Sequence, residues 1–234
     1  EMSFFIISDG KTFKKFGSAQ DHKRVGEGDK GLNTGGMGAY SPSRLENNTL
    51  DEKILKKIIK PTLKGLNDLD TNFKGFLYAG IMVVENEPYL IEYNVRMGDP
   101  ECQTILPRLK TDLFEIINSV IDQNLLNQKI EWHNDKSISV VLCSKGYPEK
   151  FENNIEIKNL DKIKLDDNNF VFHAGTKKEN LKIFSNGGRV LNFVSKSKNF
   201  KNAREQILNI IKKLDWNNGF YRRDIGYKVI DEWE

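Results

Sequence analysis

The sequence contains few of the residues that build disulfide frameworks or zinc sites. Of its 234 residues, two are cysteine, three are histidine and six are proline. Cys102 and Cys143 lie far apart in ordinary apolar contexts, so neither a disulfide framework nor a zinc site is indicated and a reducing, cytoplasmic location is the expectation. There is also no apolar run of about 18 residues and no charged-then-apolar leader, which argues against a membrane span or a signal peptide. The chain opens Glu1-Met2-Ser3 and passes directly into an apolar segment, which we interpret as a cut inside a longer protein.

An excess of charge of one sign is also missing. Lysine and arginine number 36 against 33 aspartate and glutamate, a net charge of +3, and the two signs are interleaved. A nucleic-acid-binding protein usually carries a basic face or stripe, so neither nucleic acid nor a membrane is an expected partner. The P-loop pattern GxxxxGK[ST] and the dinucleotide pattern GxGxxG do not occur, which excludes those two modes of nucleotide binding.

Apolar periodicity predicts an α+β fold with antiparallel sheets. Helices are expected over residues 49–66, 111–126 and 200–214, and Pro61 should kink or split the first of them. A domain boundary is expected near residues 127–135, giving domains 1–127 and 128–234. Strands are expected over residues 3–8, 11–16, 75–84, 89–93, 138–143, 170–173, 182–184 and 188–194.

Residues 18–43 are rich in glycine and show little periodicity, so we expect a long loop. Loops of that length are usually functional or disordered. Glycines let backbone amides approach an anion closely, and consecutive amides can form an anion-binding nest. Residues 21–24 place an acid beside three potential cations, with His22 expected to be exposed. A flexible surface connection is an equally good interpretation of this segment by itself.

Residues 89–101, read as YLIEYNVRMGDPE, carry the most chemical information. Side chains alternate between the faces of a strand, so Glu92, Asn94 and Arg96 should project to one side. Carboxylate and amide oxygens suit Mg²⁺ that also coordinates nucleotide phosphates, and an arginine can neutralise a phosphoryl group or grip a carboxylate. The alternatives are structural: Arg96 could pair with Asp99 or Glu101, and these acids could brace the turn.

Taken in order, several segments resemble the glycinamide ribonucleotide synthetase (phosphoribosylamine–glycine ligase) family of the ATP-grasp superfamily. The resemblance covers essentially the whole chain. It is carried by DHKRVG at 21–26, NTGGMGAYSP at 33–42, GFLYAG at 75–80, IEYNVRMGDPE at 91–101, GYP at 146–148, VFHAGT at 171–176, NGGRVL at 186–191 and FYRRDIG at 220–226.

The resemblance implies a reaction and a set of roles. The family joins glycine to 5-phosphoribosylamine with ATP and Mg²⁺ or Mn²⁺ through a glycyl phosphate. By position, Glu92 and Asn94 would bind the metal, Arg96 would stabilise the phosphoryl group or the carboxylate, and Asp99 would orient the amine. Glu1 would contact the nucleotide ribose. The substrate-binding residues would be Asp21, His22, Lys23, Arg24, Thr34, Gly35, Gly36, Met37 and Glu101.

The resemblance also implies an architecture. Residues 1–127 would form the C-terminal part of an ATP-grasp domain, an antiparallel sheet with helices, and residues 128–234 a small mostly-β C-terminal domain. Family members are longer, so a missing N-terminal half is an expected partner besides glycine and 5-phosphoribosylamine, and the chain alone is expected to be inactive.

Two other functions stay open on the sequence. The chain could belong to a different ATP-grasp ligase or carboxylase, or it could be a non-catalytic binding module. Three individual residues also have interpretations without a function: His173 would be a packing histidine, and Arg222 and Arg223 would be solvated charges.

Overall fold

The computed structural model describes residues 1–230, which form two compact units. The first unit contains residues 1–20, 42–98 and 109–133, and the second contains residues 21–41, 99–108 and the chain from residue 134 onward. These units differ from the expected domains 1–127 and 128–234, because two early segments pack with the later part of the chain. No helix within residues 1–230 is long and apolar enough to cross a membrane.

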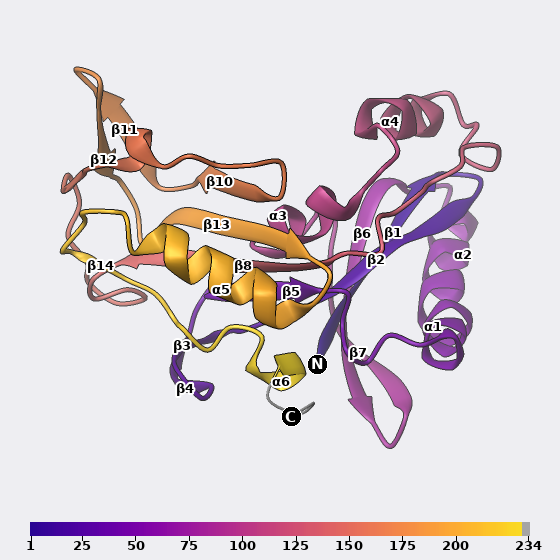
Figure 1. The fold of residues 1–234 in the computed structure, drawn as a ribbon. Coiled ribbons are helices and arrows are strands. Elements are labelled where there is room, and N and C mark those ends of the chain that lie inside the picture. The colour runs from indigo at the N-terminus through magenta and orange to yellow at the C-terminus, as the bar shows by residue number, and fades with distance from the viewer. Residues whose placement is uncertain (231–234) are drawn as a thin grey trace. The chain divides into compact units, whose positions relative to one another are not determined.

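The first unit is built on an antiparallel sheet with the strand order β2-β1-β6-β7 (Figure 1). All eight residues of β1 are buried, since it lies between two neighbours and is covered on both faces. Three of the expected strands are confirmed, and the one expected at 11–16 starts later and runs further. The bounds are β1 Met2–Asp9, β2 Phe13–Asp21, β6 Lys74–Val84 and β7 Glu87–Asn94.

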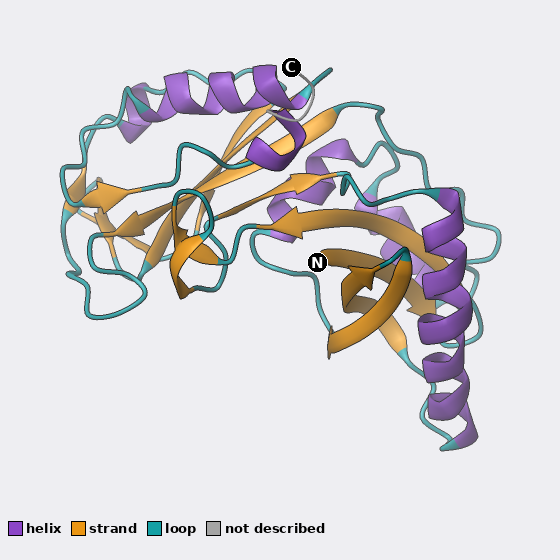
Figure 2. Cartoon of the chain, turned by 90° about the horizontal axis from the view of Figure 1, so that it is seen from below, coloured by secondary structure: helices purple, strands orange, loops and turns teal. Residues whose placement is uncertain are grey.

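One long helical segment of the first unit passes through Pro61 without a break (Figure 2). It consists of α1 (Asn48–Ile54), a π-helical turn (Leu55–Ile59) and α2 (Lys60–Asp68). Proline supplies no N–H and its ring crowds the carbonyl four residues earlier. The wider turn directly before Pro61, closed by a bond from Lys60 N to Leu55 O, accommodates it. The expected kink or split is therefore replaced by a local π turn.

Helix ends in this unit are set by side-chain caps. Asn47 Oδ1 accepts a hydrogen bond from Leu50 N at 2.9 Å at the start of α1. Asp112 Oδ1 accepts one from Phe114 N at 2.8 Å, and α4 (Leu113–Ile121) begins there. Such caps satisfy amides that have no partner inside the helix. The helix expected over 111–126 is thus shorter at both ends.

The second unit contains a sheet with the order β10-β13-β8-β5, and the short strand β14 pairs with the end of β8. Helix α5 lies along β13 and β8 in Figure 1. Its apolar side, Ala203, Ile207 and Ile211, packs in the same core as Phe193 and Val140. The sheet and its helices are β5 Gly38–Ser41, β8 Lys136–Ser144, β10 Asn169–His173, β13 Arg189–Ser197, β14 Gly219–Phe220, α3 Glu101–Ile105, α5 Phe200–Ile211 and α6 Tyr227–Ile230.

Two smaller sheets complete the second unit. One is a hairpin and the other has the order β11-β12-β9. Short 3₁₀ turns cover Leu106–Arg108 and Leu160–Lys162. The strands are β3 Arg24–Gly26, β4 Lys30–Asn33, β9 Glu156–Ile157, β11 Thr176–Glu179 and β12 Lys182–Ser185.

The expectation of a long loop over residues 18–43 is wrong. That segment holds the end of β2 together with β3, β4 and β5. Gly38 shows why a glycine-rich segment forms a strand here: β5 lies so close to β8 that a Cβ on Gly38 would sit 2.4 Å from Ser139 O. A residue chosen for close approach reads as a loop signal in a sequence.

The core of the second unit makes a stability prediction. Phe193→Ala, at a side chain only 1% exposed, should lower the free energy of unfolding by about 3–5 kcal/mol through lost burial and a residual cavity. Phe172→Ala, on the neighbouring strand but 36% exposed, is the matched control and should cost clearly less. Urea unfolding of the three proteins is the measurement, and equal losses for the two variants would contradict the assigned core.

Candidate active-site segments

The candidate metal ligands Glu92 and Asn94 lie near the end of β7. Glu92 pairs with Gly80 and Asn94 with Tyr78, and the register slips between Gly80 and Ile81, which leaves Ile91 as an extra residue. Asn94 Nδ2 donates to Glu92 Oε1 at 3.4 Å, so the two side chains project to the same side. The glycine opposite leaves room for this, because a Cβ on Gly80 would lie only 3.2 Å from Glu92 Cγ.

The donor chemistry of this pair fits a hard divalent cation. Asn94 uses its amide nitrogen on Glu92, which leaves the amide oxygen of Asn94 and the second carboxylate oxygen of Glu92 as acceptors. Mg²⁺ takes oxygen ligands and is usually held by one or two protein groups together with substrate phosphates and water. No group of three or more His, Cys, Asp or Glu residues that could hold a metal occurs among residues 1–230. A cation at this pair would therefore take its other ligands from water or from the phosphates of a bound molecule.

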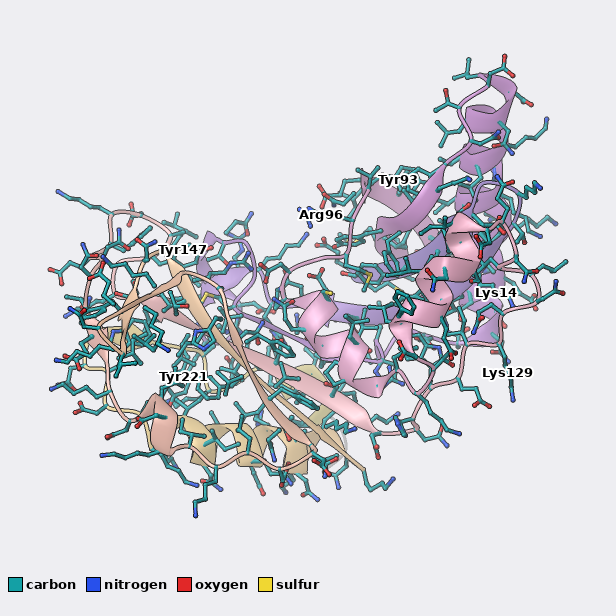
Figure 3. All side chains as sticks on the ribbon, turned by 90° about the horizontal axis from the view of Figure 1, so that it is seen from above. Lys14, Tyr93, Arg96, Lys129, Tyr147 and Tyr221 are labelled. Carbon is teal, nitrogen blue, oxygen red and sulfur yellow. The ribbon has the colours of Figure 1, made fainter. Side chains whose placement is uncertain are left out.

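Arg96 and Glu1 are the other predicted site residues of the first unit. The Arg96 side chain is exposed (Figure 3). Its Nη1 donates to the adjacent carbonyl of Met97 at 2.9 Å. Glu1 is exposed, and its backbone oxygen accepts a hydrogen bond from Gln20 Nε2 at 2.9 Å. The catalytic role of Arg96 and the nucleotide contact of Glu1 stay predictions.

The second unit brings the glycine-rich segment and the Asp99 turn together through Arg189. Arg189 Nη1 donates to Gly35 O at 2.7 Å and to Asp99 O at 2.6 Å, while Nη2 lies 3.1 Å from Asp99 Oδ2. Asp99 Oδ1 also accepts from Gln103 Nε2 at 3.1 Å. Sequence reasoning missed Arg189, although it lies in the quoted NGGRVL segment. The signal was a lone arginine directly after two glycines.

Gly36 allows this close approach. Its φ is +116°, and a Cβ there would lie 2.5 Å from Pro100 Cδ and 2.8 Å from Asp21 Oδ1. Only glycine combines that backbone conformation with that contact. The structure therefore places Asp21, Gly36 and the Asp99-Pro100 turn next to one another, as three separate stretches of sequence.

An anion-binding nest, which the glycine-rich sequence allows, would use consecutive backbone amides such as those of residues 35–37. The amide of Gly35 donates to Tyr147 Oη at 3.0 Å and that of Gly36 to Thr34 Oγ1 at 3.0 Å. The amide of Met37 donates to His22 O at 2.9 Å. These three donors are therefore engaged within the protein and are not available to an anion in this structure. The side chains that remain as candidates for anion contact are the partly exposed Lys23 and the exposed Arg24.

The turn around Asp99 is held in place by contacts from α3. Thr104 Oγ1 donates to Pro100 O at 2.8 Å and lies 2.8 Å from Ser139 Oγ on β8. Glu101, a predicted substrate contact, is buried at the first position of this helix. Burial, with the charges of Asp99 and Glu101, raises the pKa of the Cys102 thiol. A thiol held protonated is a poor nucleophile.

His22 and Met37 are buried rather than exposed. His22 Nε2 accepts from Gly226 N at 3.1 Å, so the proton of the neutral ring is on Nδ1, which lies 3.3 Å from Asp29 Oδ1. Burial lowers the pKa of His22, although the neighbouring Asp29 opposes the shift. The Met37 sulfur lies 3.7 Å from the Cys143 sulfur inside the core. The expectation of an exposed His22 is wrong, and substrate contact by either residue stays a prediction.

Arg222 is not solvated charge, because its side chain is 1% exposed. It lies 2.8 Å from Asp29 and 2.7 Å from Asp224. Burial works against the charged guanidinium, but hydrogen bonds to Asp224 and Asp29 raise the pKa of Arg222. Hydrogen bonds from His22, Lys228 and Arg222 hold the pKa of Asp29 well below its usual range despite its partial burial. Arg223 differs: it is exposed and pairs with Glu27 at 2.9 Å.

The lowered pKa of His22 predicts a pH-dependent stability. The unfolded chain binds the His22 proton at a higher pH than the folded chain does. The stability gained by burying the neutral His22 ring is fully present above the unfolded pKa of about 6.5. It is lost as the pH falls toward the folded pKa, by up to about 1.4 kcal/mol per pH unit. His22→Gln, which does not titrate, should lose less stability than the unaltered protein between pH 7.5 and 5.5. Urea unfolding at the two pH values is the measurement, and equal losses would show that His22 does not contribute.

Comparisons with known proteins show that the fold is that of an ATP-grasp protein. The family described as "Phosphoribosylglycinamide synthetase, ATP-grasp (A) domain" matches residues 1–102. The family described as "Phosphoribosylglycinamide synthetase, C domain" matches residues 137–228. The chain belongs to the phosphoribosylglycinamide synthetase family. The resemblance expected from the sequence segments is thereby confirmed.

Individual relatives support this assignment. Curated proteins named phosphoribosylamine–glycine ligase from Brucella melitensis and Agrobacterium fabrum are 41% and 44% identical over 231 and 230 residues. The crystal structure of phosphoribosylamine–glycine ligase from Thermotoga maritima has a TM-score of 0.85 at 30% identity, covering 97% of this chain and 56% of that chain. The biotin carboxylase domain of a thermophilic 2-oxoglutarate carboxylase shares the fold alone, with a TM-score of 0.66 at 13% identity over 93% of this chain and 47% of that chain.

The two curated relatives are matched over 99% and 98% of this chain but over only 54% of their own length. The chain thus spans about half the length of the curated relatives that it matches.

Proposed function

We propose that this chain supplies part of an ATP- and Mg²⁺-dependent ligase that joins glycine to 5-phosphoribosylamine. The observation that carries the proposal is the Glu92–Asn94 oxygen pair on β7, inside the segment matched by the ATP-grasp description. Curated relatives bearing the name of this ligase support the substrates. The metal donors are oxygens, which Mn²⁺ accepts as well as Mg²⁺.

The proposed chemistry needs charge neutralisation and positioning more than a protein nucleophile. ATP transfers its γ-phosphoryl group to the glycine carboxylate and leaves as ADP. The amine of phosphoribosylamine then attacks the acyl carbon, phosphate leaves and the nitrogen loses a proton. A divalent cation at Glu92 and Asn94, when bound, would neutralise phosphate oxygens. Arg96, which donates a hydrogen bond to the neighbouring carbonyl of Met97, is proposed to contact the phosphoryl group.

The second unit is proposed to hold the other substrate groups. Asp99 keeps its carboxylate between Gln103 and Arg189, a fixed orientation that suits an acceptor for a substrate amine. Lys23 and Arg24 supply cations for a ribose phosphate or a carboxylate. Arg189 joins these residues as a group that orients Asp99.

The remaining parts of the proposal concern partners and location. An N-terminal half, which the family resemblance implies, would supply the groups that hold the ATP phosphates and the adenine. Cys102 and Cys143 are free thiols, which fits a reducing compartment, and we propose the cytoplasm.

The metal pair gives the direct test of this function. In a polypeptide of the relatives' length that contains this sequence, Glu92→Ala and Asn94→Ala should each lower glycine-dependent ATP turnover by about 100-fold or more, a usual effect of removing electrostatic stabilisation of a transition state. Both should also raise the Mg²⁺ concentration needed for half-maximal rate. Glu87→Gln is the matched control on the same strand, because Glu87 pairs with Lys53 and Lys57 instead. Turnover that depends on bicarbonate rather than glycine would favour a carboxylase.

The chain alone should not bind Mg-ATP. It offers two oxygen ligands at β7, whereas the lysines that hold ATP phosphates in the family fall outside residues 1–234 by the resemblance. Titration calorimetry of the 234-residue chain with Mg-ATP is the measurement, with the longer polypeptide as positive control. Tight binding by the 234-residue chain would show that the nucleotide site lies in residues assigned here to other roles.

A further inference from the structure

We propose that Arg222 together with residues 224–228, called here the tail clamp, positions the proposed substrate-binding segment 21–37, with Arg222 as the principal positioning residue. The inference rests on the proposed function in one respect, the identity of the molecule that the segment binds. All of the contacts below lie within the second unit. They assign a role to a part of the chain that supplies no reacting group.

Arg222 contacts the hairpin β3–β4 both at β3 and at the turn. Its Nη1 donates to Arg24 O at 2.9 Å and to Asp29 Oδ1 at 2.8 Å. Its Nε and Nη2 donate to the two carboxylate oxygens of Asp224 at 2.8 and 2.7 Å. One buried guanidinium therefore engages the backbone of β3, the turn between β3 and β4, and its own tail.

Other members of the clamp reach the same turn. Asp224 Oδ2 accepts from Gly28 N at 2.8 Å, and Tyr227 Oη donates to Asp29 Oδ2 at 3.0 Å. Lys228 also donates to Asp29. The amide of Gly226 donates to His22 Nε2 at 3.1 Å. The clamp thus contacts the hairpin at both ends.

The hairpin depends on these contacts because it has little else to hold it. A two-stranded hairpin is marginally stable at best in water. All four residues of β4 (Lys30–Asn33) are exposed, and β3 is at most partly buried. The apolar contact of the hairpin with the core is made by the partly buried Val25, so the ion pairs and hydrogen bonds of the clamp supply most of what fixes its position.

The clamp also reaches the glycine-rich stretch by way of the backbone. Thr34 N donates to Lys23 O at 2.7 Å, and Met37 N donates to His22 O at 2.9 Å. His22 N donates to Gly38 O at 2.9 Å. Displacing residues 22–24 would therefore displace residues 34–38 as well, and with them the carbonyl of Gly35 that Arg189 contacts.

Arg222→Lys tests the role of the guanidinium. Lysine keeps the positive charge but lacks the planar fork that reaches two carboxylates and a carbonyl together. The matched control is Arg223→Gln, the adjacent residue on the same tail, whose partner Glu27 lies in the same hairpin. The Arg223–Glu27 pair is exposed, with side-chain exposures of 73% and 44%, and exposed pairs contribute little.

Two measurements on the 234-residue chain separate positioning from general stability. The first is amide hydrogen exchange, compared between residues 22–37 and the core strands β8 and β13. In Arg222→Lys the exchange of residues 22–37 should accelerate by at least about tenfold, the effect of losing one charge-assisted hydrogen bond. The core strands should be unchanged, and Arg223→Gln should resemble the unaltered chain. Asp224→Asn, which keeps the Arg222–Asp29 contact, is a second and milder variant in case Arg222→Lys does not fold.

The second measurement is the Kd for glycinamide ribonucleotide, the product of the proposed reaction, by titration calorimetry. Arg222→Lys should raise this Kd by at least about tenfold, for the same reason, and Arg223→Gln should leave it unchanged. Unchanged exchange of residues 22–37 in both Arg222→Lys and Asp224→Asn would overturn the clamp. Equal acceleration throughout the second unit would also overturn it, because Arg222 would then act on stability alone. Absence of binding by the unaltered chain would instead contradict the proposed substrate, and the exchange result would still decide whether the clamp holds the hairpin.

Discussion

The arrangement of the candidate site in the second unit depends on the hydrogen bonds of the Arg189 guanidinium. It contacts a carbonyl of the glycine-rich segment and both the carbonyl and the carboxylate of Asp99. These groups come from parts of the chain about 60 to 150 residues apart in sequence. Arginine suits this position because its donors lie in one plane at fixed angles, whereas a lysine would reach one partner at a time.

The distribution of hydrogen bonds limits how this site can recognise an anion. Backbone amides of residues 35–37 are already used inside the protein. Under the proposed function, recognition of an anion by this segment would therefore use side chains, above all Lys23 and Arg24.

The sequence alone predicted most of the strands and the paired oxygens, because those depend on local patterns. Continuous apolar runs marked β1 and β6, and the period of two marked Glu92 and Asn94 as neighbours. The strand β5 was missed because Gly38 serves close packing against a strand about 100 residues later in the chain. No local pattern contains that contact.

Burial of polar residues was the other part that could not be read from the sequence. His22 and Arg222 looked like exposed residues, since charged and ionisable side chains are rarely buried unless paired. Their partners, Asp29 and Gly226, become neighbours only in the folded chain. The π turn before Pro61 is similar: the sequence indicated a conflict in the helix but not how the backbone would resolve it.

The extra residue at Ile91 in β7 has a consequence for the evolution of this strand. A strand presents alternate residues to opposite sides, and a bulge adds one residue that has no counterpart on the partner strand. The slip between Gly80 and Ile81 means that Leu90 and Glu92 occupy successive pairing positions on β6. Removing Ile91 would place Glu92 directly after Leu90, opposite Gly80 as before, so Glu92 and Asn94 would keep their face and only the local bend and twist of the bulge would be lost. A deletion at this position is therefore compatible with the pairing of the strand, and substitutions at Ile91, whose side chain is half exposed, are weakly constrained by burial.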